Sequence, residues 1–403
     1  MRRLAYILSL ILIFTIPWED AFTFTGFGTI TRIIGLSTFG VWLAAVTITG
    51  KFRKLQVIHW LVFLFILWNV ASIFWTHSYE ETTQQIKTYV QLAILTWIIW
   101  DLYKTFPALN AALQTFILGA YIAVFSTVYN YLRGREIKLY SGGRYAGVGN
   151  AVDLALVLAI GLPIAWHLVS SSDVRLNNRL LRLIYLVYIP AASFAIVLTG
   201  TRTAIFAVLP AFAYILWTSN RLKPAIQFLM FIALICSVFV LQSYIPQSAI
   251  ERLGTTSSSI ATGDLGGRVK LWREALSIFL DHPYWGIGSG ALSSKHELGA
   301  VAHNTFLSVL AELGLIGFLL FMSILAIIAY QISQQNKHYA QLWFTIWSIW
   351  TIGVFTLTWE YRKATWLILT LTVVSASLIE ARKVVRNRTA SLSDSKVMSF
   401  PPN

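Results

Sequence analysis

Apolar runs of membrane-spanning length recur along almost the whole of this chain, and they restrict its fold more than any other feature. A run of about 20 mostly apolar residues crosses a bilayer as a helix. Hydrophobic residues make up 57% of the 403 residues and charged residues only 12%, which is about half the charged share of soluble domains. The sequence therefore predicts an all-α polytopic membrane protein, with membrane lipids and no nucleic acid among its partners.

Twelve spans are expected, at residues 4–17, 29–50, 57–75, 88–103, 109–130, 151–169, 183–199, 203–218, 225–243, 304–330, 342–358 and 364–380. An even number puts both termini on one side. The linkers on that side carry slightly more Lys and Arg than the others, which favours cytoplasmic termini. The membrane domain is expected to cover 1–383, including an outer loop at 244–303, and the polar tail 384–403 to be disordered.

The start of the chain, with Arg2 and Arg3 before an apolar stretch, resembles a signal peptide. No small-x-small cleavage site follows in "PWEDAFT", so we interpret the stretch as an uncleaved first span. The single cysteine, Cys236, lies inside an apolar run. No disulfide can form within the chain, and the thiol is expected to be a small core residue.

The face opposite the termini should be poor in Lys and Arg, yet it carries many of them. Most lie in two loops, 131–150 and 244–303. A basic outer face indicates an anionic ligand. A solvated rim that contacts lipid headgroups is the alternative, and charge counting leaves both open.

The long outer loop changes character along its length. Residues 252–267 are small and polar, which predicts flexibility. The next stretch places Trp272, Ala275, Leu276 and Phe279 at helical spacing, and it should end as a helix at "DHP" because proline cannot continue one. This amphipathic helix either lies on the membrane surface or caps the bundle. The glycine-rich "GIGSG" at 286–290 lacks the Lys-Ser/Thr of a phosphate-binding loop, so we interpret it as a turn.

Candidate functional residues stand where the outer loops meet spans. His303 lies at the membrane–water boundary, where it is either a reactive base or an interfacial histidine held by a carbonyl. Arg202 in "LTGTRTAIF" occupies the lip of a tight hairpin, where it either meets an anion or extends to headgroups. The stretch "GGRYAGVGNAVDLAL" places Arg144 and two further polar residues, Asn150 and Asp153, at another span entrance.

Four stretches together resemble the O-antigen ligase and polymerase superfamily of bacterial membrane glycosyltransferases. They are "HNTFLSVLAELGLIG", "GGRVKLWREAL" followed by "HPYWGIGSGAL", "TGTRTAIF" and "RYAGVGNAVDLAL". The resemblance rests on their order and spacing over roughly residues 140–320. It implies a GT-C-like fold in the bacterial inner membrane, with the active site on the periplasmic face.

The resemblance implies transfer of a glycan from undecaprenyl diphosphate. In the ligase branch the acceptor is lipid A–core, in the polymerase branch another lipid-linked repeat, and in a third branch a protein hydroxyl. The essential residues of the ligase branch correspond here to His303, Arg202 and Arg268. We favour the ligase branch because the chain is compact with one dominant outer loop.

The residues suit such chemistry without a metal or other cofactor. The chain contains no Asp-x-Asp motif, and guanidinium groups can neutralise a diphosphate leaving group by bidentate contacts. Arg202 and Arg268 would do this, with Arg144, Arg273 and Asn304 as substrate-binding helpers. His303 has the intrinsic pKa of a general base. One base without a carboxylate pair predicts direct displacement with inversion.

Two further expectations concern the span after His303. Glu312 is interpreted as a packing contact rather than a group that faces substrate, and Gly314 and Gly317 as residues that allow close helix approach. A transporter of lipid-linked glycan is the rival function. It would place ionisable residues near the bilayer midplane, whereas the candidates here gather at one face.

Overall fold

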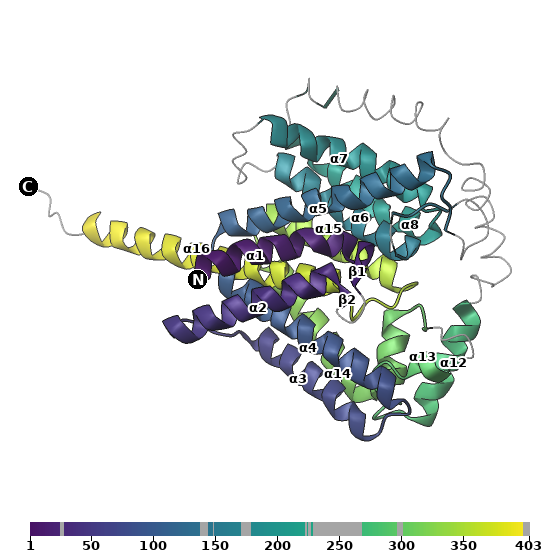
Figure 1. The fold of residues 1–403 in the computed structure, drawn as a ribbon. Helices are drawn as coiled ribbons and strands as arrows, with labels where there is room; N and C mark the ends of the chain where they lie inside the picture. Colours follow the sequence, from purple (N-terminus) through teal and green to yellow (C-terminus); the bar gives the residue numbers. More distant parts are fainter. Residues whose placement is uncertain are drawn as a thin grey trace, which may run out of the picture.

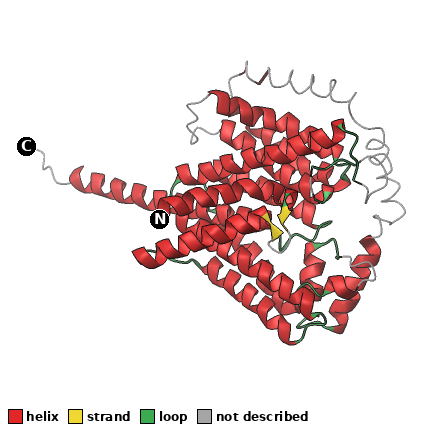
Figure 2. Cartoon of the chain, in the orientation of Figure 1, coloured by secondary structure: helices red, strands yellow, loops and turns green. Residues whose placement is uncertain are grey.

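A computed structural model describes residues 1–24, 28–137, 144–147, 149–170, 179–221, 224, 227–228, 268–295 and 301–397. The described chain is a bundle of long helices with two very short paired strands (Figures 1 and 2). The helices are α1 (Arg2–Thr15), α2 (Ile30–Thr49), α3 (Val57–Ala71), α4 (Tyr79–Leu102), α5 (Phe106–Leu132), α6 (Ala151–Ser170), α7 (Arg179–Leu198), α8 (Arg202–Thr218), α12 (Arg268–Asp281), α13 (Leu292–Lys295), α14 (Thr305–Ser333), α15 (Lys337–Val354) and α16 (Lys363–Val397). Short 3-10 helices cover Ile16–Ala21, Ser72–Phe74 and Ser219–Arg221, and β1 (Thr23–Phe24) pairs antiparallel with β2 (Gly28–Thr29).

Eleven of the twelve predicted spans fall on these helices. Within the described residues, eight helices are long and apolar enough to cross a membrane, and α8 is a shorter apolar helix. The chain is thus an all-α, multi-pass membrane protein. The ninth predicted span at 225–243, with Cys236, lies almost entirely outside the described residues, and so do the predicted flexible residues 252–267.

The boundaries of two spans differ from the prediction. Helix α4 begins at Tyr79, nine residues before the predicted start at 88, because Glu80 and Glu81 occupy its first turn, where the helix dipole favours acidic side chains. Helix α16 continues to Val397, whereas disorder was predicted from residue 384. Its extension contains no proline or glycine, so no residue of that kind interrupts the helix beyond the bundle (Figure 1).

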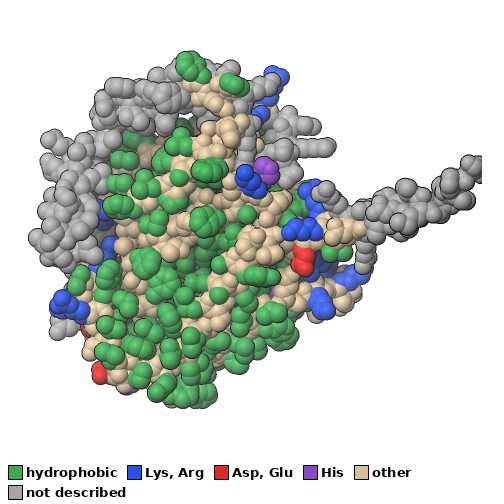
Figure 3. Space-filling model, turned by 180° about the vertical axis from the view of Figure 1, so that it is seen from behind, with side chains coloured by type: hydrophobic (Ala, Val, Ile, Leu, Met, Phe, Trp, Pro, Cys, Tyr) green, Lys and Arg blue, Asp and Glu red, His purple; other side chains and the backbone are tan. Residues whose placement is uncertain are grey.

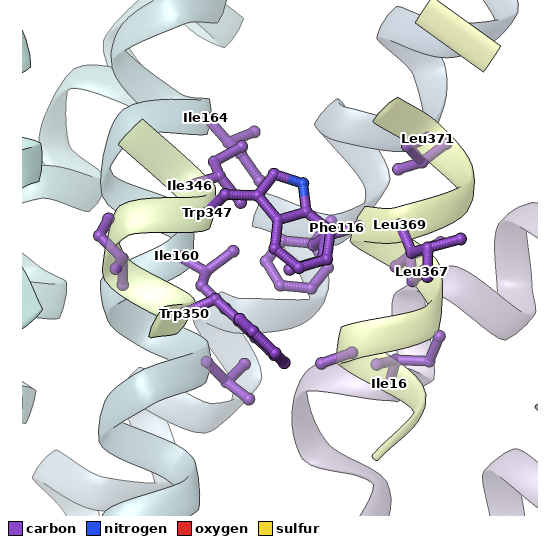
Figure 4. Packing of buried hydrophobic residues seen from close by; sticks show 14 of the residues in the cluster. Ile16, Phe116, Ile160, Ile164, Ile346, Trp347, Trp350, Leu367, Leu369 and Leu371 are labelled. Carbon is purple, nitrogen blue, oxygen red and sulfur yellow. The ribbon is translucent and has the colours of Figure 1, made fainter. Parts of the chain in front are cut away.

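Helix α6 occupies the centre of the bundle. Every residue from Ala151 to Val169 except Asp153 is buried, as expected for a helix that is apolar on all sides. Helix α15 packs against it, and its Trp347 and Trp350 project between α6 and Leu367–Leu371 of α16 (Figure 4). Buried tryptophans of this size contribute strongly to stability, and truncating one costs about 3–5 kcal/mol. This core holds the ends of the central helices in register.

The exterior is apolar between two polar ends. The back of the molecule carries a broad apolar surface, and the Lys and Arg side chains visible there lie mostly toward its edges (Figure 3). At one end, which we call the termini end, the buried Asp101 accepts hydrogen bonds from Arg2 Nη1 (3.1 Å) and from the backbone N–H of Arg53 (3.0 Å), and it pairs with Lys104. The other end contains His303, so we call it the His303 end.

The segment 283–290, which we call the glycine turn, inserts beside a break in α14. The break is at Gly314, which has φ 65° and ψ −168°. The glycine turn satisfies backbone groups near it: Gly288 N–H donates to the carbonyl of Glu312 (2.9 Å), and Leu315 N–H donates to the carbonyl of Pro283 (2.8 Å). This arrangement meets the requirement that a broken membrane helix find other hydrogen-bond partners.

The contacts of Gly314 contradict its predicted role in close helix approach, and those of Gly317 agree with that role. Gly314 does not serve close helix approach: an added Cβ there would meet the backbone of Tyr284 in the glycine turn at 2.3 Å. A Cβ on Gly317 would lie 3.1 Å from Trp68 of α3, so Gly317 does allow two helices to approach. The interpretation of "GIGSG" as a turn is confirmed.

The predicted amphipathic helix is confirmed as α12, which ends at Asp281 just before His282 and Pro283. It packs against α14 and buries Ala275 there. Leu276 is 45% exposed. The contact with α14 is therefore centred on Ala275 and is narrower than the apolar stripe.

Candidate active site

His303 has an unusual backbone conformation just before α14. Its φ is 49°, and among the described residues it is the one non-glycine with a positive φ. Such a conformation costs on the order of 1–3 kcal/mol and is found preferentially at functional sites. The next residue, Asn304, caps α14: its Oδ1 accepts hydrogen bonds from the backbone N–H groups of Phe306 (3.0 Å) and Leu307 (3.1 Å). The cap fixes the chain directly after the histidine.

The loop 355–362, between α15 and α16, is hydrogen-bonded to the start of α14. Asn304 Nδ2 donates to the carbonyl of Phe355 (3.4 Å), and Thr305 Oγ1 donates to the carbonyl of Leu357 (3.0 Å). Both Asn304 and Thr305 are buried. The side chain of Asn304 is therefore engaged at both ends with the protein, and its predicted contact with substrate stays a prediction.

Arg202 is the first residue of α8 and is partly exposed. Its neighbour Thr203 accepts a hydrogen bond of 2.8 Å from Thr356 Oγ1. The loop 355–362 thus contacts the starts of both α8 and α14, and Arg202 lies at the same end of the bundle as His303.

Arg144 supports the turn that leads into Arg202. Its guanidinium is buried, with Nε donating to the carbonyl of Thr199 (2.9 Å) and Nη2 to Thr201 Oγ1 (3.2 Å). Between them, Gly200 has φ 57°, a left-handed conformation that glycine adopts without strain. Arg144 therefore orders the 199–201 turn.

His303 lies within the electrostatic reach of two side chains of opposite charge. Burial lowers its pKa, the Arg268 guanidinium lowers it further, and the Asp153 carboxylate raises it. The net direction is down from the ordinary value. An imidazole with a lowered pKa is neutral at pH 7 and can accept a proton.

A small polar cavity lies beside this charged group. It is lined by residues of the chain start, α6, the loop 355–362 and the start of α16, and Glu19, Asp20, Asn150, Asp153, Trp359 and Arg362 are among its polar members. Arg362 Nη2 contacts Asp153 Oδ2 at 2.5 Å, and Trp359 Nε1 donates to Asp153 Oδ1 at 2.7 Å. Asp153 is thus held by two donors and is oriented at the edge of the cavity.

Two buried carboxyl groups lie deeper, below the helix start. Ser308 Oγ donates to Glu360 Oε1 (3.1 Å), and burial raises the pKa of Glu360 to about 7. Glu312 Oε2 accepts a hydrogen bond from Gly290 N–H at 2.7 Å. Glu312 therefore holds the glycine turn against α14, which supports its interpretation as a packing residue. Both side chains are too deeply buried to meet an aqueous substrate.

The two candidate arginines of α12 differ in their position relative to His303. Arg268, half-buried at the start of α12, lies near enough to His303 for its charge to lower the pKa of the imidazole. Arg273 is exposed and five residues further along the same helix, which turns it about 140° away from Arg268. The role of Arg273 in substrate binding stays a prediction.

Three residues of the site were not assigned a role from the sequence: Asp153, Trp359 and Arg362. Asp153 was noticed only as a polar residue at a span entrance. Its contact with Arg362 joins positions 209 residues apart, so no local spacing could relate them. The sequence did give one indication: Asp153 and Arg362 each lie at the end of an apolar run, where an unpaired charge is energetically costly.

Within the described residues, no group of three or more His, Cys, Asp and Glu side chains is placed to hold a metal ion. The cationic members of the site are arginines. Their guanidinium groups offer fixed donors that suit phosphate or diphosphate oxygens.

Residues 187–322 match the family described as O-antigen ligase. The match begins within α7, covers α8 and α12 and ends within α14, and it includes Arg202, Arg268 and His303. No curated protein matches the chain.

Proposed function

We propose that this chain, which the match over residues 187–322 assigns to the O-antigen ligase superfamily, is an O-antigen ligase of the bacterial inner membrane. It transfers a glycan from undecaprenyl diphosphate to lipid A–core on the periplasmic face, and both termini are cytoplasmic. A membrane glycosyltransferase that uses a lipid-linked glycan is the broader function that the family supports.

In the proposed reaction, a hydroxyl oxygen of the acceptor forms a bond to the anomeric carbon of the donor glycan. The bond between that carbon and the diphosphate oxygen breaks, and its electron pair leaves with the diphosphate. His303 accepts the hydroxyl proton. Arg268 and Arg202 stabilise the negative charge on the leaving group, which is the role that a metal fills in other transferases. A single displacement inverts the anomeric configuration.

The observation that carries this proposal is the environment of His303. Its strained backbone is fixed by the Asn304 cap, and its ring feels the charges of the Arg268 guanidinium and the Asp153 carboxylate. A neutral base beside a cation is what the transfer needs, because the base must accept a proton while the cation meets the leaving group.

The experiment is reconstitution of the purified protein with the lipid-linked glycan donor and, separately, lipid A–core, a second lipid-linked repeat, or a protein rich in Ser and Thr. Product on lipid A–core supports the ligase. Product on the lipid-linked repeat or on protein alone replaces it with the polymerase or the protein-glycosylating branch. Movement of the donor across a vesicle membrane without transfer would favour a transporter.

Variants of His303 test the mechanism in the same assay. His303→Ala should leave donor binding nearly intact and reduce single-turnover transfer by about 10²–10⁴-fold. His303→Gln should be equally impaired, because an amide can hydrogen-bond but cannot act as a base. His338→Gln, at the start of α15 near the termini end, is the matched control and should transfer normally. Full activity of His303→Gln would remove the histidine from the mechanism.

A further inference from the structure

An apolar groove runs along the outside of the bundle between α1, α2 and α4. Leu12 of α1, Leu36 and Phe39 of α2, and Leu95 and Ile98 of α4 contribute to its walls. Arg32 and Phe39 are seven residues apart on α2, which corresponds to about 10 Å along the helix axis. The groove therefore begins at the His303 end and continues into the membrane-embedded part of the bundle.

A glycine keeps the groove open. Gly35 lies on α2 within the lining, and an added Cβ there would meet only Leu12 Cδ1, at an ordinary contact distance of 3.7 Å. The absent side chain leaves room for a hydrocarbon chain to lie between α1 and α2. Gly40, on the same helix, would meet nothing within 4 Å and is not part of the lining.

Two cations lie at the end of the groove nearest His303. Lys363 forms an ion pair with Glu19. Arg32 is exposed, and among the described residues no carboxylate pairs with its guanidinium. A free guanidinium at the end of an apolar channel matches a lipid that carries a phosphate directly above its hydrocarbon chains.

The groove adjoins the polar cavity of the candidate active site. Glu19 lines the cavity and Lys363 lines the groove, so their ion pair separates the two. Lys363 directly follows Arg362, which contacts Asp153. A molecule with its chain in the groove and its headgroup at Arg32 would therefore place its sugars over the cavity, toward His303. The cavity offers them carboxylates, an amide and the half-buried Trp18 ring, groups that bind sugar hydroxyls and pack on sugar rings.

The groove and the arginines assigned to the leaving group belong to different parts of the bundle. Arg268 is on α12, which packs against α14, and Arg202 is on α8, which packs against α6 and α15. The groove is formed by α1, α2 and α4. A transfer between two lipids needs a separate binding site for each lipid, and Arg202 and Arg268 already provide the proposed site for the donor diphosphate.

We infer that the groove seats one acyl chain of lipid A, with a lipid A phosphate at Arg32 and the core sugars extending across the polar cavity to His303. This inference rests on the proposed function, and it identifies the anchoring site of the acceptor. Lipid A fits because its phosphates and its acyl chains are attached to the same pair of sugars.

The test is a set of steady-state transfer assays in which lipid A–core and the lipid-linked donor are varied separately. Gly35→Trp fills the groove and should raise the KM for lipid A–core by tenfold or more without changing the KM for the donor. Gly40→Trp adds the same side chain to the same helix outside the groove and should behave as the wild type. Arg32→Gln should raise the acceptor KM by about tenfold, the loss expected for one charge-assisted contact.

Core oligosaccharide with its lipid removed supplies the second arm, because it has no chain to seat. On this acceptor, Gly35→Trp, Arg32→Gln and the wild type should transfer at equal rates. A rise in donor KM would assign the groove to the prenyl chain and overturn the inference. Equal effects of Gly35→Trp and Gly40→Trp on the KM for lipid A–core would mean that the groove contacts only bulk lipid, and this result would also overturn the inference. Absence of any transfer to lipid A–core by the wild type would instead contradict the proposed function.

Discussion

The two charges on either side of His303 should move the pH dependence of transfer in opposite directions. The base must be deprotonated, so the rate should fall as the pH drops through the pKa of His303. Burial and Arg268 lower that pKa, and Asp153 raises it. Arg268→Gln removes a lowering influence and should move the acidic limb of the pH profile to higher pH. Asp153→Asn removes the raising influence and should move it to lower pH.

The size of each shift follows from the setting of each charge. A single charge near a half-buried group is worth on the order of 1 kcal/mol at an effective dielectric constant of about 20–40. Arg268 should deliver most of that energy. Asp153 should deliver less, because its carboxylate is already paired with Arg362 at 2.5 Å and acts on the histidine partly neutralised.

The assay is single-turnover transfer at saturating donor between pH 5 and 8, with each variant normalised to its own plateau. Arg268→Lys is the matched control: it keeps the charge and loses the bidentate fork. Its plateau should fall while its acidic limb stays in place. The double variant Arg268→Gln with Asp153→Asn should have a smaller upward shift than Arg268→Gln alone. Shifts of both single variants in the same direction, or an unmoved limb in Arg268→Gln, would refute the assignment of His303 as the titrating base.

Three further predictions concern the turn, the metal and the topology. Gly286→Ala should destabilise the protein by about 2 kcal/mol or more, because its Cβ would lie 2.4 Å from the Glu312 backbone at φ 68°. The control Gly134→Ala, at φ 61° with open space around it, should cost only about 1–2 kcal/mol. Equal losses of thermal stability in detergent would contradict the proposed packing of the glycine turn against α14. Transfer should survive excess chelator, and a loss that Mg²⁺ or Mn²⁺ restores would mean that the arginines are not the main phosphate partners. In a chain with Cys236→Ala, cysteine replacing Ser294 should react with an impermeant thiol reagent from the periplasm, and cysteine replacing Gln334 should not; the reverse result would overturn the orientation.

Local sequence patterns were sufficient to place eleven helices, although they missed the start of α4 and the end of α16. Apolar runs longer than a bilayer is thick can only be helices in lipid, so the spans could be placed without knowing their neighbours. The end of α12 could also be predicted from the nearby sequence, because Pro283 cannot continue a helix. The candidate histidine and arginines also came from the sequence, through motifs whose order resembles a family.

Contacts between distant segments decided the rest. The break at Gly314 depends on the glycine turn, which supplies the hydrogen bonds that the broken helix loses. The exposure of Leu276 depends on how α12 lies on α14. Neither depends on the residues nearby in the chain alone.

The chain by itself determined which segments are helices and which few ionisable residues stand at their ends, because hydrophobic length and proline act over a few residues. Only the tertiary structure decided that Asp153 meets Arg362, that loop 355–362 ties α8 to α14, and that Gly35 opens a groove beside Arg32. A charge and its partner, or a groove and its walls, are set by which helices pack together. That choice depends on the summed fit of many side chains, and no single stretch of sequence records it.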